Sequence, residues 1–136
     1  MSEAEVTIEY GIGGDGPTLR LAATPQGVAL LQALFRRLAA GQVRVMLQDG
    51  AGVRLSGIDG VELLHQGGDF RLRRVGRRGQ PSGFVWAGDA ERWQSRAELL
   101  DPLTHSQSGS FQYLDYDGIG DATVVVECQR QQHKPE

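Results

Sequence analysis

Cysteine, lysine and long apolar runs are all scarce in this sequence. Cys128 is the one cysteine among 136 residues, so no disulfide bond can form within the chain. No apolar stretch approaches the roughly 20 residues that a membrane-spanning helix needs. The acidic start MSEAEVT lacks the apolar core of a secretory signal. From these absences we expect a cytoplasmic protein that does not enter a membrane.

The common catalytic motifs are missing as well. The sequence has no HExxH, CxxC or GxSxG pattern, the arrangements that bring zinc ligands, redox thiols or an activated serine together. The residues that most often act as ligands or nucleophiles, His65, His105, His133 and Cys128, lie far apart along the chain. We therefore predict no catalytic site, no metal site and no cofactor, and expect that the protein is not an enzyme.

The composition is that of an ordinary globular domain, with 40% hydrophobic and 23% charged residues. A chain of this length can bury a core of its own. We predict one α+β domain over residues 1–130 and a flexible polar tail over residues 131–136. The charge is unevenly spread: residues 69–100 carry seven bases and four acids, whereas residues 101–136 carry two bases and six acids.

One segment, TPQGVALLQALFRRLAAG, has every feature of a helix with its two ends. Thr24 suits the N-cap, Pro25 the first helical position and Gly41 the position just after the helix. Between these ends, large apolar residues recur every three or four positions and so share one face. They are Val28, Leu31, Leu34, Phe35 and Leu38. The pattern predicts a long helix over about residues 25–40 that packs this face on a sheet.

The rest of the chain is typical of short strands separated by turns. Apolar and polar residues alternate over Val6–Tyr10, as in a half-buried strand. Asp49-Gly50 indicates a hairpin that joins strands at about 43–47 and 53–55. The run Val124–Val126 predicts a central strand buried on both faces.

A second, shorter helix is predicted over about residues 90–100. Asp89 is a suitable N-cap, and Pro102 is expected to stop the helix. Many strands and two helices together predict an α+β fold, in which both helices pack on a mainly antiparallel sheet.

Two glycine-containing segments resemble ligand-binding loops, and for both we favour a purely structural role. YGIGGDGP, at 10–17, would need to lead into a helix N-terminus to cradle a phosphate, but a strand follows it. We predict a hairpin loop there. The acidic segment Asp115–Asp121 resembles a calcium loop but lacks the EF-hand spacing. We predict a tight hairpin, and weak calcium binding remains the open alternative.

Arginines cluster near the middle of the chain. Such a cluster can bind the phosphates of a nucleic acid, or it can keep an edge strand from pairing with other chains. Because the protein is acidic overall and no aromatic residues are interspersed, we favour the second role and expect no nucleic-acid partner. The cluster consists of Arg71, Arg73, Arg74, Arg77 and Arg78.

Tyrosines and carboxylates are interspersed near the C-terminus. Tyrosine offers a large contact area and a hydroxyl group, and for this reason it is enriched in protein interfaces. The alternative is a strand whose tyrosines border the core. We predict a partner-binding surface that contains Tyr113, Asp115, Tyr116, Asp117 and Asp121.

The segment LRLAATPQGVALLQALFRRLAAG, followed by a hydrophobic strand and short hairpins, resembles small bacterial immunity proteins of polymorphic toxin systems. The resemblance covers mainly Leu19–Leu72. It implies a single cytoplasmic α+β domain that neutralises one cognate toxin by binding it. It implies no particular site residues.

We therefore expect a non-enzymatic protein-binding domain of the immunity type, whose acidic surface would suit a basic nuclease toxin. One alternative is a homo-oligomeric structural or regulatory domain with a sheet edge as its interface. Another is a small ligand-binding protein or enzyme with a cleft beside His65, His105 or Arg71.

Overall fold

The computed structural model describes residues 5–13, 16–50, 52–67, 72–76, 83–104, 110–115 and 123–129. Within these ranges the chain forms nine strands, two longer helices and two single turns of helix. The elements are β1 (Val6–Gly13), β2 (Gly16–Ala23), α1 (Pro25–Ala39), β3 (Arg44–Met46), η1 (Leu47–Asp49), β4 (Val53–Ser56), β5 (Gly60–His65), β6 (Leu72–Val75), β7 (Gly83–Gly88), α2 (Ala90–Leu99), α3 (Asp101–Thr104), β8 (Phe111–Asp115) and β9 (Thr123–Cys128).

The strands form two mixed sheets. The first sheet has the order β4-β1-β2-β9-β8, and the second sheet has the order β3-β5-β7-β6. Four of the pairs are antiparallel: β1–β2, β8–β9, β3–β5 and β6–β7. Three are parallel: β1–β4, β2–β9 and β5–β7. The α+β class and the two packed helices are confirmed. Antiparallel pairs outnumber parallel pairs by four to three, but the strands form two mixed sheets and not the one mainly antiparallel sheet that was predicted.

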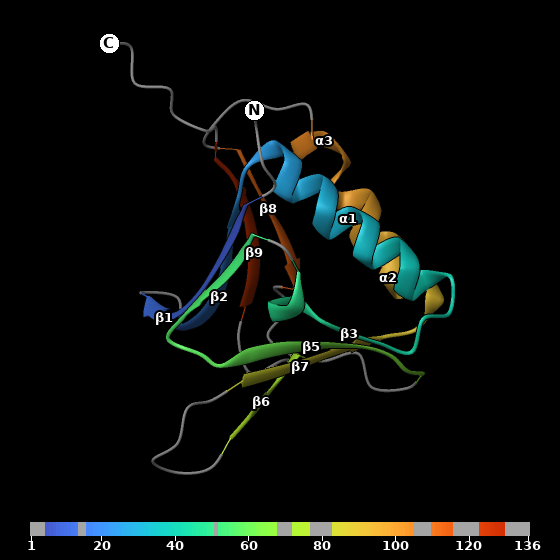
Figure 1. Ribbon diagram of the computed structural model, residues 1–136, viewed down its shortest axis with the longest axis horizontal. Coiled ribbons are helices and arrows are strands. Elements are labelled where there is room, and N and C mark those ends of the chain that lie inside the picture. Colours follow the sequence, from blue (N-terminus) through green and yellow to red (C-terminus); the bar gives the residue numbers. More distant parts are fainter. Residues whose placement is uncertain are drawn as a thin grey trace.

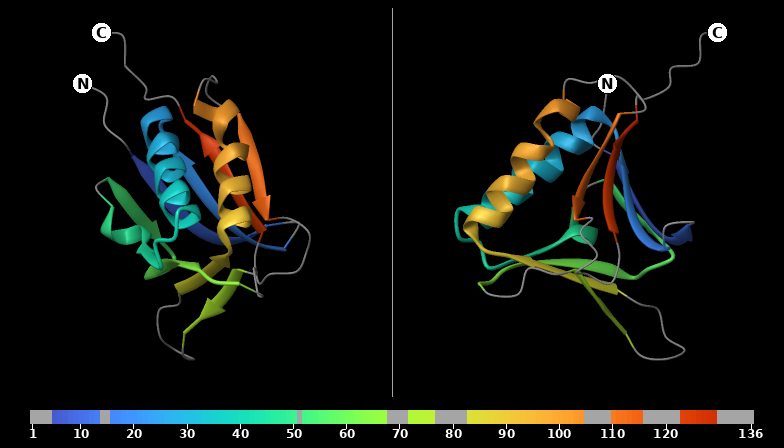
Figure 2. Two further views of the ribbon diagram at one scale, coloured as in Figure 1. Left: turned by 90° about the vertical axis from the view of Figure 1, so that its right-hand side faces the viewer. Right: turned by 180° about the vertical axis from the view of Figure 1, so that it is seen from behind.

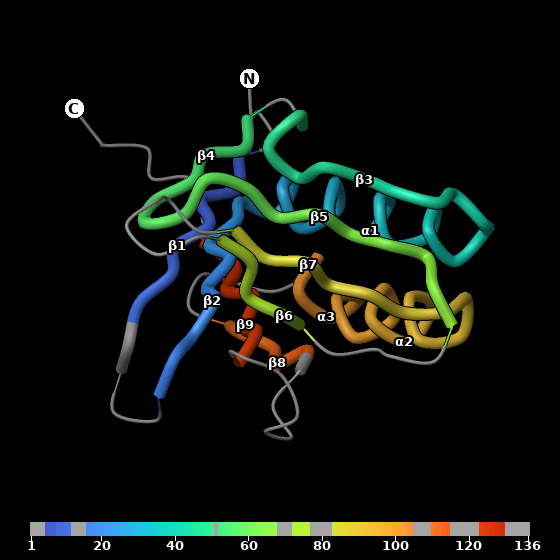
Figure 3. The backbone as a smooth tube through the Cα atoms, turned by 90° about the horizontal axis from the view of Figure 1, so that it is seen from below, coloured from blue at the N-terminus to red at the C-terminus, as the bar shows by residue number. Residues whose placement is uncertain are grey.

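The two sheets and the helices form three walls around one core (Figure 1). Seen from behind, the first sheet stands upright, the second sheet runs across the bottom, and the helices close the third side (Figure 2, right). Helices α1 and α2 lie side by side (Figure 2, left). When the molecule is seen from below, the second sheet lies in front of the two helices (Figure 3). Both helices therefore cover the inner face of the first sheet and leave its outer face uncovered by any described helix.

Helix α1 begins and ends as its sequence predicts. The Thr24 hydroxyl accepts hydrogen bonds from the backbone N–H groups of Gly27 and Glu5, both at 3.1 Å. This one side chain therefore caps the helix and also fastens it to the start of β1. At the other end Gly41 has a φ of +113°, the left-handed conformation that glycine adopts without a steric penalty. All five residues of the predicted apolar face are buried.

Substitution of Gly27 by alanine is expected to destabilise the protein, although alanine is the better helix former by about 1 kcal/mol. A Cβ atom at this position would collide with the backbone carbonyl group of Glu5 and would also press on Ala23. Because backbone atoms cannot move aside cheaply, we expect a net loss of about 1–3 kcal/mol in the free energy of unfolding. Urea denaturation monitored by circular dichroism measures this loss.

Gly67→Ala is the matched control, since a Cβ atom at Gly67 would meet nothing within 4 Å. Its stability should change by less than about 0.5 kcal/mol or rise slightly. A Gly27→Ala protein as stable as the wild type would show that α1 does not approach β1 this closely.

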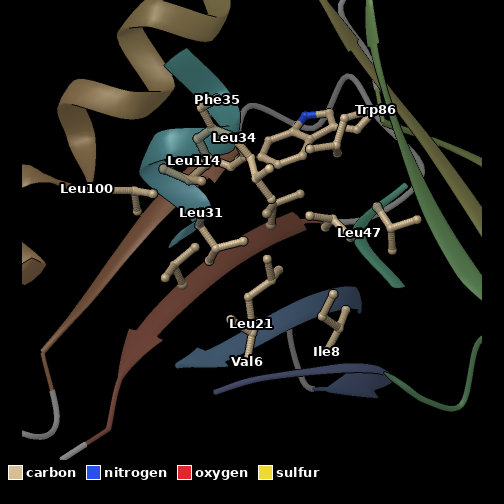
Figure 4. Close-up of a cluster of buried hydrophobic side chains, with 14 of the residues drawn as sticks. Val6, Ile8, Leu21, Leu31, Leu34, Phe35, Leu47, Trp86, Leu100 and Leu114 are labelled. Atoms are coloured by element: carbon tan, nitrogen blue, oxygen red, sulfur yellow. The ribbon is translucent and has the colours of Figure 1, made fainter. Parts of the chain in front are cut away.

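The core lies where the three walls meet. Val6, Ile8 and Leu21 point inward from the first sheet, Leu31 and Phe35 from α1, and Trp86 from the second sheet (Figure 4). Every one of these side chains is fully buried or nearly so. The core is thus a single cluster shared by both sheets and the helices, so no wall can be removed without exposing the others.

Aromatic rings form one end of this core. Trp86 of β7 and Trp93 of α2 pack with ring centroids 5.2 Å apart, and Phe35 of α1 lies 5.5 Å and 5.2 Å from them. The Arg96 side chain, which is 1% exposed, packs on both indoles with its guanidinium carbon 4.4 Å and 4.5 Å from their centroids. Arg96 Nη1 also donates a hydrogen bond of 2.9 Å to the carbonyl oxygen of Ala87. A cation is therefore part of the packing that joins α2 to β7.

Three local predictions are corrected by the fold. The segment at Asp49-Gly50 does not join a hairpin, because it forms η1 and separates β3 of the second sheet from β4 of the first. Val125 is only partly buried although β9 is an interior strand, because no helix in the described ranges covers the outer face of the first sheet. Helix α2 ends before Pro102, as expected, with Leu100 as its C-cap. Pro102 does not end all helical structure, however, because it lies within the short α3, where a proline near the start of a helix lacks no needed donor.

Candidate protein-binding surface

The outer face of the first sheet carries side chains from every one of its strands. Strand register places Tyr113, Val125, Arg20 and Glu9 in one row across β8, β9, β2 and β1. The neighbouring row contains Phe111 and Glu127 in the same way. Inward-facing residues alternate with these, as the burial of Leu114 and Val124 shows.

Two aromatic rings stand exposed at the β8 end of this face. Phe111 is 57% exposed and Tyr113 is 41% exposed. Their rings touch edge to face, with centroids 5.7 Å apart and planes at 88°, which is a favoured geometry for aromatic pairs. Val125 lies directly across from Tyr113 on β9 and is partly exposed. We call these three residues the aromatic patch.

A row of charges borders the aromatic patch. Arg20 on β2 forms ion pairs with Glu9 on β1, at 2.8 Å, and with Glu127 on β9. The three side chains are 40%, 47% and 27% exposed, so solvent weakens both ion pairs. Because two carboxylates share one guanidinium, this border keeps one net negative charge.

The structure describes only part of the predicted partner-binding surface, which stays a prediction. Tyr113 is exposed on the outer face of the first sheet. Asp115 ends β8, but its side chain is outside the described residues. Tyr116, Asp117 and Asp121 also fall outside the described residues, together with most of the segment considered for calcium.

Sequence reasoning missed Phe111 and Val125. The signal was present, because residues two apart on a strand share a face and Phe111 is two positions before Tyr113. Val125 could not be found in this way, because its place beside Tyr113 depends on the register between two strands.

The histidine and cysteine residues do not assemble in the part of the chain that the structure describes. His65 Nδ1 lies 2.6 Å from the carbonyl oxygen of Leu38, to which it can only donate, so this side chain fastens β5 to the end of α1. Cys128 is fully buried near the opposite end of α1, where the following residue, Gln129, bonds to the carbonyl of Ala23. His105 and His133 are outside the described residues, and among those described no three His, Cys, Asp or Glu residues group as metal ligands do.

The arginine cluster is only partly described. Arg73 and Arg74 are exposed on β6, an edge strand of the second sheet, while Arg71, Arg77 and Arg78 fall outside the described residues. The Arg74 guanidinium lies 5.0 Å from the ring centroid of Tyr10, which in turn packs on Phe84. At least one of these arginines therefore takes part in the contact between the two sheets.

A shallow hollow lies at the start of α2. It has a volume of about 280 Å³ and is lined by Asp89, Glu91, Arg92 and Ser95. The Asp89 carboxylate already accepts the Arg92 backbone N–H at 2.8 Å as the helix cap. Both signs of charge border the hollow, so it offers no selective environment for either an anion or a cation.

Comparison with protein-family models, with curated proteins and with solved structures finds no match to this chain. Among the helices in the described ranges, none has the length and apolar character required to span a membrane.

Proposed function

We propose that this chain is a non-enzymatic protein-binding domain whose partner docks on the outer face of β8 and β9. The observation that carries the proposal is the aromatic patch, in which two rings in edge-to-face contact stand exposed on a sheet face that no described helix covers. Aromatic residues dominate the binding energy of protein interfaces because they bury much area and lose little conformational entropy. On a strand they are also held in place by the backbone, so little ordering is needed on binding.

The charge around the patch favours a basic partner. The border formed by Glu9, Arg20 and Glu127 keeps a net negative charge, and residues 101–136 carry six acids against two bases. Opposite charge on the partner would accelerate association and orient it. The rate of binding should therefore fall as ionic strength rises.

Within this proposal, the specific role is that of an immunity protein that neutralises a cognate toxin. The support is the resemblance over Leu19–Leu72, together with a surface whose charge suits a basic nuclease toxin. Deletion of this chain from its producer, with the neighbouring gene intact, should then arrest growth. Unimpaired growth after deletion, with no toxic product from a neighbouring gene, would rule this role out.

Tyr113→Ala should weaken binding of the neighbouring gene's product by about 2 kcal/mol, which is about a 30-fold rise in Kd. The substitution removes exposed aromatic area from the centre of the proposed interface while the β8 backbone is retained. Isothermal titration calorimetry measures the change. The matched control is Val43→Ala, because Val43 is 70% exposed and lies on the loop between α1 and β3. Equal affinity of the Tyr113→Ala and Val43→Ala variants would place the interface elsewhere.

A further inference from the structure

The four sheet edges of this molecule differ in charge. The edge strands are β4 and β8 in the first sheet and β3 and β6 in the second. Arginine is exposed on three of them: Arg54 on β4, Arg44 on β3, and Arg73 and Arg74 on β6. Charged side chains on an edge oppose pairing with another chain. The segment Ser110–Leu114 contains no charged residue, and Asp115 at the end of β8 is the one charged residue of that strand, so this edge has less of the protection that the others have.

The register of β8 shows which of its backbone groups face outward. The N–H of Cys128 donates to the carbonyl of Ser110 at 2.8 Å, so Phe111 and Glu127 form a non-hydrogen-bonded pair. In an antiparallel ladder the next pair, Gln112 with Val126, is then the hydrogen-bonded one. The backbone groups of Phe111 and Tyr113 consequently point away from β9, toward the edge of the sheet, where no other described strand pairs with β8.

We infer that β8 pairs with β8 of a second copy of this chain, so that two first sheets join into one continuous sheet. The two strands run antiparallel about a two-fold axis at Gln112, which faces Gln112 of the second copy. Phe111 then lies opposite Tyr113 of the second copy. In this register the N–H of Phe111 donates to the carbonyl oxygen of Tyr113 in the second copy, and symmetry repeats the bond.

The side chains fit this arrangement. Phe111 and Tyr113 of the two copies share one face, so the two aromatic pairs meet as cross-strand neighbours, a favourable pairing. No charged residues oppose one another between Ser110 and Tyr113. The Tyr113 carbonyl already accepts the Gln112 side-chain amide at 3.1 Å, but a carbonyl oxygen has two lone pairs and accepts a second bond.

The paired segment is short, because a register irregularity follows Tyr113. A small interface predicts a weak dimer, with a Kd between about 1 µM and 1 mM. Pairing lies in the plane of the sheet, so it leaves the outer face open and brings two aromatic patches together. The inference therefore stands independently of the proposed partner, and it is tested in the absence of one.

The decisive comparison is Phe111→Pro with Phe111→Ala. Both variants lose the aromatic ring, but only the proline variant also loses the N–H group that points away from β9. Proline is tolerated on an edge strand when its nitrogen faces away from the ladder. Sedimentation velocity up to about 1 mM measures dimerisation across the Kd range expected for a small interface. We expect the wild type to approach twice the 14.8 kDa monomer mass, the alanine variant to dimerise at least about threefold more weakly, and the proline variant to stay monomeric.

A wild type that stays monomeric throughout would overturn the inference, as would a proline variant that dimerises as well as the alanine variant. Thermal melting followed by circular dichroism checks that both variants fold. If the proline variant does not fold, backbone amide shifts of the wild type on dilution decide the question. Shifts confined to Phe111 and its β8 neighbours support the pairing, and shifts confined to β3, β4 or β6 refute it.

Discussion

Replacement of Trp86 by alanine is expected to lower the free energy of unfolding by about 3–5 kcal/mol. Trp86 is fully buried where the second sheet meets the helices, and it contacts Phe35 and Trp93 with ring centroids 5.5 Å and 5.2 Å away. Alanine would leave a cavity between the two sheets and the helices, and the backbones of these elements cannot move enough to fill it. Urea denaturation followed by far-ultraviolet circular dichroism measures the loss without relying on tryptophan fluorescence.

The control for this substitution is Leu99→Ala on the neighbouring helix α2. Leu99 is 39% exposed, so its truncation should cost about 0.5 kcal/mol or less. A loss below about 1 kcal/mol for Trp86→Ala would mean that the second sheet and the helices do not share a core.

Removal of the Arg96 guanidinium is expected to cost about 2–4 kcal/mol, combining lost cation–π contact with a buried carbonyl that loses its donor. The affected carbonyl is that of Ala87, which now accepts Arg96 Nη1 at 2.9 Å. Two opposing effects decide whether the free energy of unfolding falls or rises. Substitution by methionine removes the desolvation penalty of a buried charge, but it also removes the contacts with Trp86 and Trp93. Because the guanidinium has both rings and a carbonyl as partners, we expect destabilisation to prevail.

Arg96→Lys distinguishes charge from shape. Lysine keeps the positive charge but lacks the planar group that lies flat against aromatic rings, so its loss should be close to that of Arg96→Met. Both are measured by urea denaturation, with the exposed Arg36→Met as control. Full stability of Arg96→Lys would assign the role to charge alone, and a methionine variant more stable than wild type would show that desolvation prevails.

The interaction energy between Trp86 and Arg96 is a stricter measure of the same packing. In a double-mutant cycle, residues in contact show interaction energies of about 0.5–3 kcal/mol. Trp86 and Arg96 lie 4.4 Å apart, measured from the guanidinium carbon to the ring centroid. The loss in the doubly substituted protein should therefore be smaller than the sum of the two single losses.

The candidate surface was predictable only in part. Tyr113 could be singled out because tyrosine beside carboxylates is typical of interfaces. Phe111 lies two positions away on the same strand, but Val125 lies on β9, twelve positions away, and nothing local in the sequence indicates that Val125 lies opposite Tyr113. The charge border likewise depends on the order β1-β2-β9, which places Arg20 between two glutamates.

The sequence by itself determined the local elements. Helix α1 follows from Thr24, Pro25, Gly41 and a 3.6-residue period, and α2 from the Asp89 cap, because capping and amphipathic periodicity act between neighbouring residues. The tertiary structure alone decided how the strands are distributed. Residues around Asp49-Gly50 have the composition of a hairpin turn, yet the strands on either side enter different sheets. Burial of apolar side chains over the whole molecule stabilises the fold more than any single turn does. A pairing such as β2 with β9 also joins segments some hundred residues apart, which local sequence preferences cannot specify.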